Sequence, residues 1–309
     1  MKLLRFISKE IINSLGYEVR RVPRAAEVSS TVRSGIDPVT FQYMPRIRGS
    51  AVIEIRLQDT RGLNCLGLPF HPACHPFVRT ALAAKTGLEA TSKIRSILEE
   101  FYGSVQPATA REAVDVTMGD APGLQGVPAA GWVYPWADKS VEETLRGRQT
   151  AMGLDALQYG KMLSFSEGLT AFGPVGAKKL NLEVERIQRL IASIATNGFD
   201  LFNRRNPLKV IGLRRGDNYR WIVLAGHHRF AACAAFSIAA VPAMVVDIVR
   251  YEDCSYWPQV VSGIYTVSGA RAVFDRLFEG VPARVCNGWL QGKTAQHVNG
   301  TPFPTAALH

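Results

Sequence analysis

The first clear pattern in the chain is an alternation of apolar and polar residues over 51–57, which predicts a β-strand with one buried face. Over 92–102 the apolar residues recur every three or four positions, which predicts a helix, and Thr109 marks the beginning of a second short helix. Glycine and proline are frequent over 117–138. This stretch is therefore expected to be irregular, as a linker or lid ahead of a second structural unit.

The second half of the chain has the more regular pattern. A helix is predicted over 181–197, with Asn181 as its N-terminal cap and Gly198 directly after its end. Two strands follow, over 208–213 and 219–225, and the Arg-Gly-Asp-Asn sequence between them favours a hairpin turn. Further elements are a helix at 230–236, a strand at 241–246 and a helix around 270–278.

These elements predict an α+β fold. Four segments are expected along the chain: a basic amphipathic helix at 1–25, an N-terminal mixed region of uncertain fold with a lid or linker at 26–160, a second domain at 161–285 and a mobile tail at 286–309.

The composition is that of a folded protein, because 47% of the 309 residues are hydrophobic and only 20% are charged. Lys and Arg outnumber Asp and Glu by 36 to 26, so the formal net charge is +10. This excess favours an anionic partner: nucleic acid, a phosphorylated small molecule or the cytoplasmic face of a membrane. The five cysteines are scattered, which predicts a reduced, cytoplasmic compartment, and no apolar run is long enough for a transmembrane helix.

Residues 1–24 have a helical pattern with Leu4, Ile7, Ile11 and Leu15 on one face and basic residues elsewhere. Two interpretations are open for this segment. It attaches the protein peripherally to the inner surface of an anionic membrane, or it packs on the protein's own core.

A Pro-rich loop at 67–76 contains candidate zinc ligands. Cys65, His71, Cys74 and His75 carry suitable atoms, but their spacing does not match the familiar zinc modules, and each histidine precedes a proline. An ordered loop that covers the active cleft is the favoured interpretation.

The sequence Gly226-His227-His228-Arg229 stands between a predicted strand and a predicted helix. At such a point the backbone N–H groups and the positive end of the helix dipole face one place, and glycine lets an anion approach the main chain. Arg229 can add a bidentate contact, and the two imidazoles can add donors. The alternative is that the histidines cap the turn and Arg229 pairs with a carboxylate. Phosphate binding is favoured, since basic side chains at a helix N-terminus need an anionic partner.

The stretch VLAGHHRFAA at 223–232, followed by Ala-Val-Pro-Ala at 240–243, resembles the signature of the ParB/sulfiredoxin superfamily. The resemblance extends over roughly 165–250, and more narrowly it is to ParB-like proteins of bacterial polysaccharide and envelope gene clusters. It implies a ParB/sulfiredoxin-like nucleotide-binding domain in the C-terminal half of the chain.

Three groups of that superfamily have different activities and different residues in this turn. Sulfiredoxins use a cysteine where this chain has His227, and chromosome-partition proteins carry Gly-Glu-Arg-Arg, so neither activity is expected. Free-serine kinases carry Asp-Gly-x-His-Arg, which Gly226, His228 and Arg229 match, although Ala225 replaces the aspartate.

Phosphoryl transfer also requires a base and basic groups that neutralise charge. The candidates are Glu183, Glu185 and His228 for catalysis, Gly226, His227, His228, Arg229, Lys178 and Lys179 for nucleotide binding, and Asp247 for metal. Alternatives remain for the charged groups on the helix. Glu185 is four residues from Arg189 and suited to an ion pair, Glu183 suits the helix N-terminus, and the two lysines suit a solvated surface.

The sequence thus predicts a cytoplasmic ATP-dependent kinase that uses ATP, or another nucleoside triphosphate, with Mg²⁺. Its acceptor would be a small hydroxylated molecule, such as a sugar or lipid-linked sugar of envelope polysaccharide synthesis. The alternative, favoured by Ala225 and by the net charge, is a non-catalytic nucleotide- or DNA-binding ParB-like protein. Nucleic acid is the less favoured partner.

Overall fold

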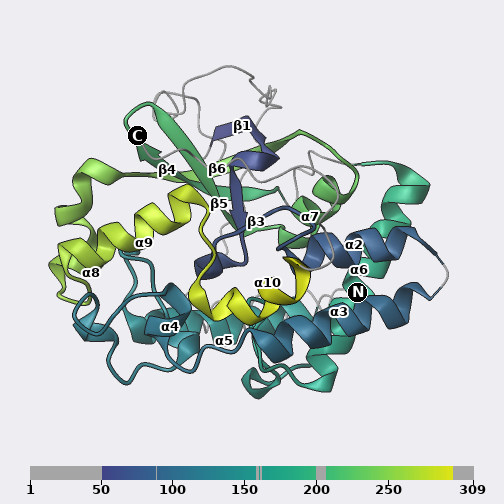
Figure 1. Cartoon of the computed structure of the whole chain (residues 1–309), viewed down its shortest axis with the longest axis horizontal. Helices are drawn as coiled ribbons and strands as arrows, with labels where there is room; N and C mark the ends of the chain where they lie inside the picture. The colour runs from purple at the N-terminus through teal and green to yellow at the C-terminus, as the bar shows by residue number, and fades with distance from the viewer. Residues whose placement is uncertain (1–50, 88, 158–159, 161, 200–206, 295–309) are drawn as a thin grey trace, which may run out of the picture. The chain divides into compact units, whose positions relative to one another are not determined.

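The computed structural model (Figure 1) describes residues 51–294, except 88, 158–159, 161 and 200–206. The amphipathic helix predicted at 1–25 lies outside the described residues, as does the rest of the chain ahead of residue 51. The described part is a mixed α+β structure with one six-stranded sheet. The strands are β1 (Ala51–Arg56), β2 (Thr60–Gly62), β3 (Leu68–Pro69), β4 (Lys209–Arg215), β5 (Asn218–Ala225) and β6 (Ala240–Arg250).

The sheet has the order β1-β6-β4-β5-β2-β3 and is mixed. β4 and β5 form the predicted antiparallel hairpin, and β4 runs parallel to β6. β1 pairs antiparallel with β6, whereas β2 runs parallel to β5. The predicted boundary near residue 160 therefore falls between strands that share one sheet. The segment before it supplies both edge strands of the sheet, β1 and β3.

The sheet is curled, and the link between its two edges shows why. Only η2 (Leu57–Asp59) joins β1 to β2, although three strands lie between them in the sheet order. In a flat sheet these two strands would be about 19 Å apart, at about 4.8 Å per step. A connection of this length spans at most about 14 Å. The sheet must therefore curve to bring β1 and β2 towards each other.

The α-helices of the described residues confirm several predicted elements and add others. They are α2 (Pro76–Lys85), α3 (Ala90–Ser104), α4 (Ala110–Val114), α5 (Val141–Leu157), α6 (Ala177–Asn197), α7 (His227–Ala235), α8 (Pro258–Val261), α9 (Val267–Glu279) and α10 (Asn287–Thr294). Short 3₁₀ helices connect them: η3 (Asn64–Leu66), η4 (Pro122–Leu124), η5 (Ala129–Gly131), η6 (Phe165–Glu167), η7 (Tyr251–Tyr256) and η8 (Arg284–Cys286). The short helix predicted to begin near Thr109 is α4, and the Thr109 side chain caps it by accepting a hydrogen bond from the Glu112 N–H.

The predicted start of the long helix at Asn181 is wrong. α6 begins at Ala177 with Gly176 as its cap, so Asn181 lies in the second turn, where its exposed side chain accepts a hydrogen bond from Arg95. The residues before Asn181 are good helix formers, and they extend the helix by one turn. Glu183 is consequently one turn farther from the helix N-terminus than the sequence suggested.

Helix α2 was not predicted, because its first residue belongs to the Pro-rich loop. Pro76 occupies the first helical position, where its missing N–H and fixed φ are favourable. The helix buries Phe77, Val78 and Ala81 in the core. A proline that the sequence pattern assigned to a loop is therefore the beginning of a core helix.

Two other segments are more ordered than predicted. The stretch 117–138 is irregular as expected, but Trp132, Val133 and Tyr134 are buried in it, so it packs into the core rather than linking two units. The tail predicted at 286–309 is wrong for its first part, because α10 is helical and fully buries Trp289. The Trp289 indole donates a hydrogen bond of 2.7 Å to the Cys74 carbonyl. Residues 295–309 lie outside the described part.

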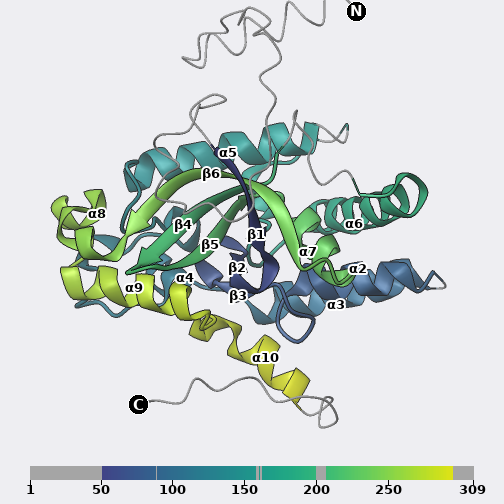
Figure 2. The same ribbon diagram turned by 90° about the horizontal axis from the view of Figure 1, so that it is seen from above.

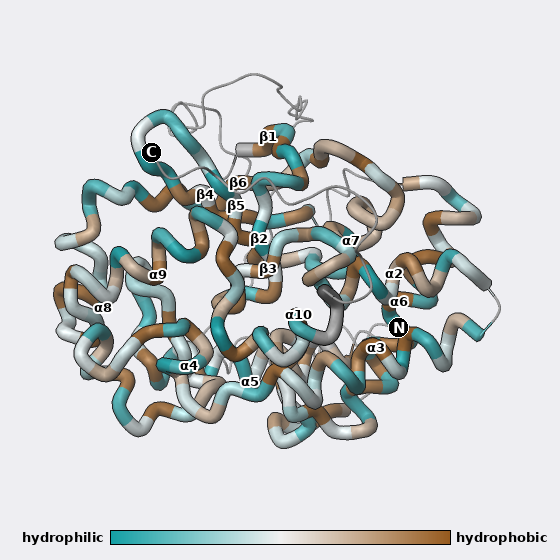
Figure 3. The backbone as a smooth tube through the Cα atoms, in the orientation of Figure 1, coloured by the Kyte–Doolittle hydropathy of each residue, from teal (hydrophilic) through white to brown (hydrophobic). Residues whose placement is uncertain are grey.

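Four helices gather at one end of the sheet. Figures 1 and 2 show α2, α3, α6 and α7 together there, with α8 and α9 at the other end. Figure 3 shows brown, hydrophobic segments along the strands and the helices. Buried apolar residues of both belong to one hydrophobic core. Within the described ranges, no helix has the length and apolar character that a membrane span requires.

Candidate functional site

The turn between β5 and α7 has a backbone conformation that requires glycine. Gly226 has φ +94°, in the left-handed region, and a Cβ atom there would lie 2.5 Å from Leu208 Cδ2. The first hydrogen bond of α7 runs from the Phe230 N–H to the Gly226 carbonyl, 2.9 Å apart. The amides of residues 227–229 precede it, and they are the N–H groups with which helix N-termini bind anions.

Arg229 folds back over this turn. One of its guanidinium nitrogens, Nη2, is 3.2 Å from the place that a Cβ of residue 226 would occupy. The same nitrogen makes a long contact of 3.5 Å with the Pro207 carbonyl. The guanidinium group therefore lies beside Gly226, the residue that precedes the first amides of α7.

Glu183 is the centre of a buried polar network beneath the turn. Its side chain is fully buried, and its Oε1 atom lies 2.5 Å from Lys179 Nζ and 2.9 Å from Arg186 Nη1. Thr170 Oγ1 donates to the same oxygen at 3.2 Å and accepts from Lys179 at 2.7 Å. The other oxygen, Oε2, lies 2.7 Å from His228 Nε2. Both carboxylate oxygens are thus occupied by protein groups.

The network keeps Glu183 ionised. Burial alone would raise the pKa of this carboxyl group, but the charge of Lys179, the hydrogen bond from His228 and the charge of Arg186 together hold it well below its usual value. Because an ionised carboxylate only accepts hydrogen bonds, the bond to His228 has Nε2–H as its donor.

His228 is held on a second side by an aromatic ring. Phe77, in the first turn of α2, stacks on the imidazole with ring centres 4.2 Å apart and an interplanar angle of 25°. Phe77 is fully buried, while the His228 side chain keeps 20% exposure. Among the described residues, no group forms a hydrogen bond with Nδ1 of His228. The atom is not among those buried without a partner, so it is not buried. This nitrogen is therefore open to solvent.

His227 has a different environment from its neighbour. Its Nδ1 atom accepts a hydrogen bond of 3.3 Å from the Leu63 N–H, which ties the turn to the segment after β2. Burial is the largest cause that lowers the pKa of His227 to about 3, against the opposing effect of Glu183. The ring is therefore neutral, and it cannot supply the second positive charge that the sequence suggested.

The remaining predicted residues either lie away from the turn or have their charged groups paired with other residues. Lys178 is exposed, whereas Lys179 is buried and its ammonium group is taken up by Glu183 and Thr170. Glu185 forms an ion pair with Arg189 one helical turn away, which confirms the alternative considered for this residue. Of the two predicted glutamates, only Glu183 reaches the turn.

Asp247 is not close to the turn. Ala225 pairs with Lys209, which pairs with Met244, and Asp247 follows three residues later in β6. Two strand spacings and three residues of rise place it on the order of 14 Å from Ala225. Its exposed side chain accepts a hydrogen bond from the N–H of Ile248. Within 51–294, apart from the gaps, no group of three or more His, Cys, Asp or Glu side chains is arranged to hold a metal ion.

The Pro-rich loop packs against α7 through aromatic rings. His75 is fully buried and stacks on Phe70 with ring centres 4.4 Å apart. Within the described part of the chain, neither of its ring nitrogens has a hydrogen-bond partner. Phe70 in turn contacts Phe230 of α7 at 5.4 Å. The loop therefore supports the first turn of α7 from the inside.

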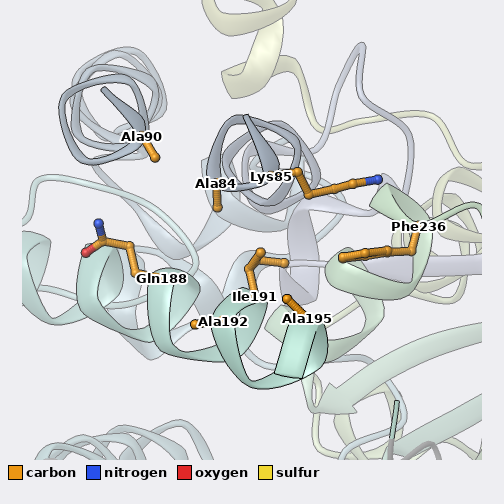
Figure 4. Close-up of a pocket in the computed structure, with 8 residues that line it drawn as sticks. All are labelled: Ala84, Lys85, Ala90, Gln188, Ile191, Ala192, Ala195 and Phe236. Atoms are coloured by element: carbon orange, nitrogen blue, oxygen red, sulfur yellow. The ribbon is translucent and has the colours of Figure 1, made fainter. Parts of the chain in front are cut away.

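A separate cavity of about 400 Å³ lies at the other end of α7 (Figure 4). It is lined by Ala84, Lys85, Ala90, Gln188, Ile191, Ala192, Ala195 and Phe236. Its two long polar side chains are engaged: Lys85 donates to the Ala235 carbonyl at 3.0 Å, and Gln188 donates to Thr91 at 2.6 Å. This apolar space is unsuited to a phosphate and is distinct from the turn.

Comparisons with protein-family models, with curated proteins and with solved structures found no match for this chain. A function can therefore be inferred only from the residues of the turn and from their contacts. Sequence reasoning identified Gly226, Glu183 and His228 but missed Thr170 and Phe77. Neither of these two belongs to a recognisable motif, because the tertiary packing alone brings them to the site.

Proposed function

We propose that the protein binds a nucleoside triphosphate at the turn formed by residues 226–229 and transfers its terminal phosphoryl group to a small hydroxylated acceptor. The observation that supports this most is the turn itself. A left-handed glycine precedes the first amides of α7, the Arg229 guanidinium group lies beside that glycine, and His228 is held by a buried carboxylate. Backbone amides, a helix N-terminus and arginine are a recurrent combination for phosphate binding.

The resemblance to the ParB/sulfiredoxin superfamily supports the same proposal. Gly226, His228 and Arg229 match the turn of its free-serine kinases, and the strand, turn, helix and strand follow one another here as β5, α7 and β6. The resemblance to ParB-like proteins of polysaccharide gene clusters suggests a sugar or lipid-linked sugar as the acceptor. A cytoplasmic protein, attached to the inner membrane face through residues 1–24, would meet such an acceptor.

Kinases that take the phosphoryl group from a nucleoside triphosphate use Mg²⁺, which neutralises charge on the phosphates. The described residues offer no carboxylate cluster for this ion, and Asp247 stands apart from the turn. Mg²⁺ commonly keeps most of its contacts to phosphate and water oxygens. The phosphate and water oxygens would therefore supply the contacts of the ion at this turn.

The experiment is a transfer assay with ATP labelled at the γ-phosphate, Mg²⁺ and a panel of hexoses, N-acetylhexosamines and lipid-linked sugars. The proposal expects label in an acceptor, and it expects Arg229→Ala to weaken ATP binding by about 1.5–3 kcal/mol, the range for a hydrogen bond to a charged group. If the dissociation constant for ATP is the same in both proteins, the nucleotide does not bind at this turn.

A second candidate function is suggested by Ala225, which stands where the free-serine kinases of the superfamily have aspartate. On this alternative the protein binds a nucleotide, or DNA, without catalysis. ATP binding that Arg229→Ala weakens, with no label in any acceptor and no hydrolysis, is the result that favours it.

A further inference from the structure

We infer that Nδ1 of His228 is the atom that takes the proton from the acceptor hydroxyl, and that Glu183 positions this imidazole rather than acting as the base. The inference rests on the proposed function and names the catalytic group within it. It reverses the expectation that a carboxylate from the long helix would be the base.

Glu183 cannot meet an acceptor in this structure. Its side chain has 0% exposure, and Lys179, Arg186 and Thr170 all contact Oε1. The remaining oxygen accepts the hydrogen bond from His228. Cations that hold the pKa of this carboxyl group well below its usual value also make it a weak base. A hydroxyl group would have to displace two or more buried contacts to reach it.

His228 has the complementary properties. Its Nε2–H is committed to Glu183, so in the neutral ring the lone pair is on Nδ1. Nδ1 has no partner among the described residues, and the side chain is partly exposed. Phe77 covers one face of the ring, so the imidazole is fixed both in its plane and along its edge. The residue also belongs to the first turn of α7, next to the amides proposed to hold the phosphate.

The reaction balances with these groups. The acceptor hydroxyl gives its proton to Nδ1 of His228, and its oxygen forms a bond to the γ-phosphorus of the nucleoside triphosphate. The bond between that phosphorus and the β–γ bridging oxygen breaks, and the nucleoside diphosphate leaves with the electron pair. The imidazolium ion so formed keeps its Nε2–H on the Glu183 carboxylate, whose negative charge stabilises it. Water takes the proton after the product leaves.

The variant His228→Gln separates the two roles of the ring. The glutamine amide can still donate to Glu183, but its carbonyl oxygen is too weak a base to take a proton in place of Nδ1. We expect the dissociation constant for ATP to change by less than about threefold and phosphoryl transfer to fall at least about 100-fold, the lower end of general-base effects. Transfer within about threefold of the native rate would overturn the inference while leaving the proposed function intact. Absence of ATP binding to the native protein would instead remove the proposed function.

A measurement on the native protein keeps the inference testable if His228→Gln does not fold. Nitrogen-15 NMR of the histidine rings distinguishes a protonated from an unprotonated ring nitrogen, and it needs neither nucleotide nor acceptor. We expect the neutral ring of His228 to carry its proton on Nε2 and to leave Nδ1 unprotonated. A neutral ring with its proton on Nδ1 would overturn the inference, because that nitrogen could not accept another.

Discussion

Glu183 of α6 and His228 of α7 are joined by a hydrogen bond of 2.7 Å between Oε2 and Nε2, although 45 residues separate them in the chain. The carboxylate has no exposed surface, whereas the imidazole reaches solvent. This bond connects the buried network around Lys179 and Thr170 to the turn at Gly226. The geometry of the turn and the stability of the helical end of the protein therefore depend on the same residue.

The first prediction concerns that carboxylate. Glu183→Gln leaves the ammonium group of Lys179 and the guanidinium group of Arg186 buried beside a neutral amide, so we expect a loss of about 3–5 kcal/mol in the free energy of unfolding. Glu185→Gln, two residues along the same helix, is the matched control. Its ion pair with Arg189 is partly exposed and should contribute less than about 0.5 kcal/mol. Equal losses in urea titrations of the two variants would contradict the buried network.

A second prediction follows from the left-handed conformation of Gly226. Gly226→Ala brings a Cβ to 2.5 Å from Leu208 Cδ2, in addition to the cost of about 1–2 kcal/mol for a left-handed L-residue. Gly216 in the β4–β5 turn has φ +57°, and no atom lies within 4 Å of the place that its Cβ would occupy, so Gly216→Ala incurs the conformational cost alone. Thermal unfolding should show the larger loss for Gly226→Ala. The opposite order would show that Leu208 does not press on the turn.

Two histidines with lowered pKa values, His75 and His227, predict how stability depends on pH. Burial is the main reason that the pKa of His75 is lowered well below 6.5 and that of His227 to about 3. The unfolded chain therefore binds more protons than the folded protein as the pH falls from about 6.5 towards 3. The free energy of unfolding should decrease through this window, by up to about 1.4 kcal/mol per pH unit for each histidine.

His75→Leu tests the contribution of one ring. Neither nitrogen of His75 has a hydrogen-bond partner, and leucine is of similar size, so we expect a change within about 1.5 kcal/mol at pH 8. At pH 4.5–6 the variant should lose stability less steeply than the native protein. An unchanged slope in denaturant titrations across this range would show that His75 is not held neutral by the fold.

Trp289 provides a test of the C-terminal helix. Its side chain is fully buried, and it contacts Phe101 edge-on at 5.3 Å. Trp289→Ala should reduce the free energy of unfolding by about 3–5 kcal/mol. Trp289→Phe keeps most of the volume but removes the donor to the Cys74 carbonyl, and it should cost about 1–3 kcal/mol. A negligible loss for Trp289→Ala in chemical unfolding would contradict the packing of α10 against the core.

Local signals explain which parts of the fold the sequence could predict. The β4–β5 hairpin has its turn residues between two apolar runs, and α4 has its threonine cap, so neighbouring residues decide both elements. Helix α2 and the burial of Trp289 were missed because they depend on packing between segments far apart in the chain. Pro76 is compatible with a loop and with the first turn of a helix, and only the burial of Phe77 decides between them.

The candidate site shows the same division. Gly226 could be identified because a glycine between a strand and a helix has a local meaning, and the turn has the expected conformation. The role of Glu183 could not be inferred in this way. Its burial and its contacts with Lys179, Thr170 and His228 come from three separate segments. The sequence could name a carboxylate near the turn, but only its solvent exposure indicates which group can meet a substrate.

The most direct test of the account is a crystal structure with a non-hydrolysable nucleoside triphosphate analogue and Mg²⁺. The account predicts phosphate oxygens within hydrogen-bond distance of the amides at 227–229 and of the Arg229 guanidinium group, with Nδ1 of His228 facing the γ-phosphate. A nucleotide bound elsewhere, with the Gly226 turn closed by the protein's own side chains, would contradict it.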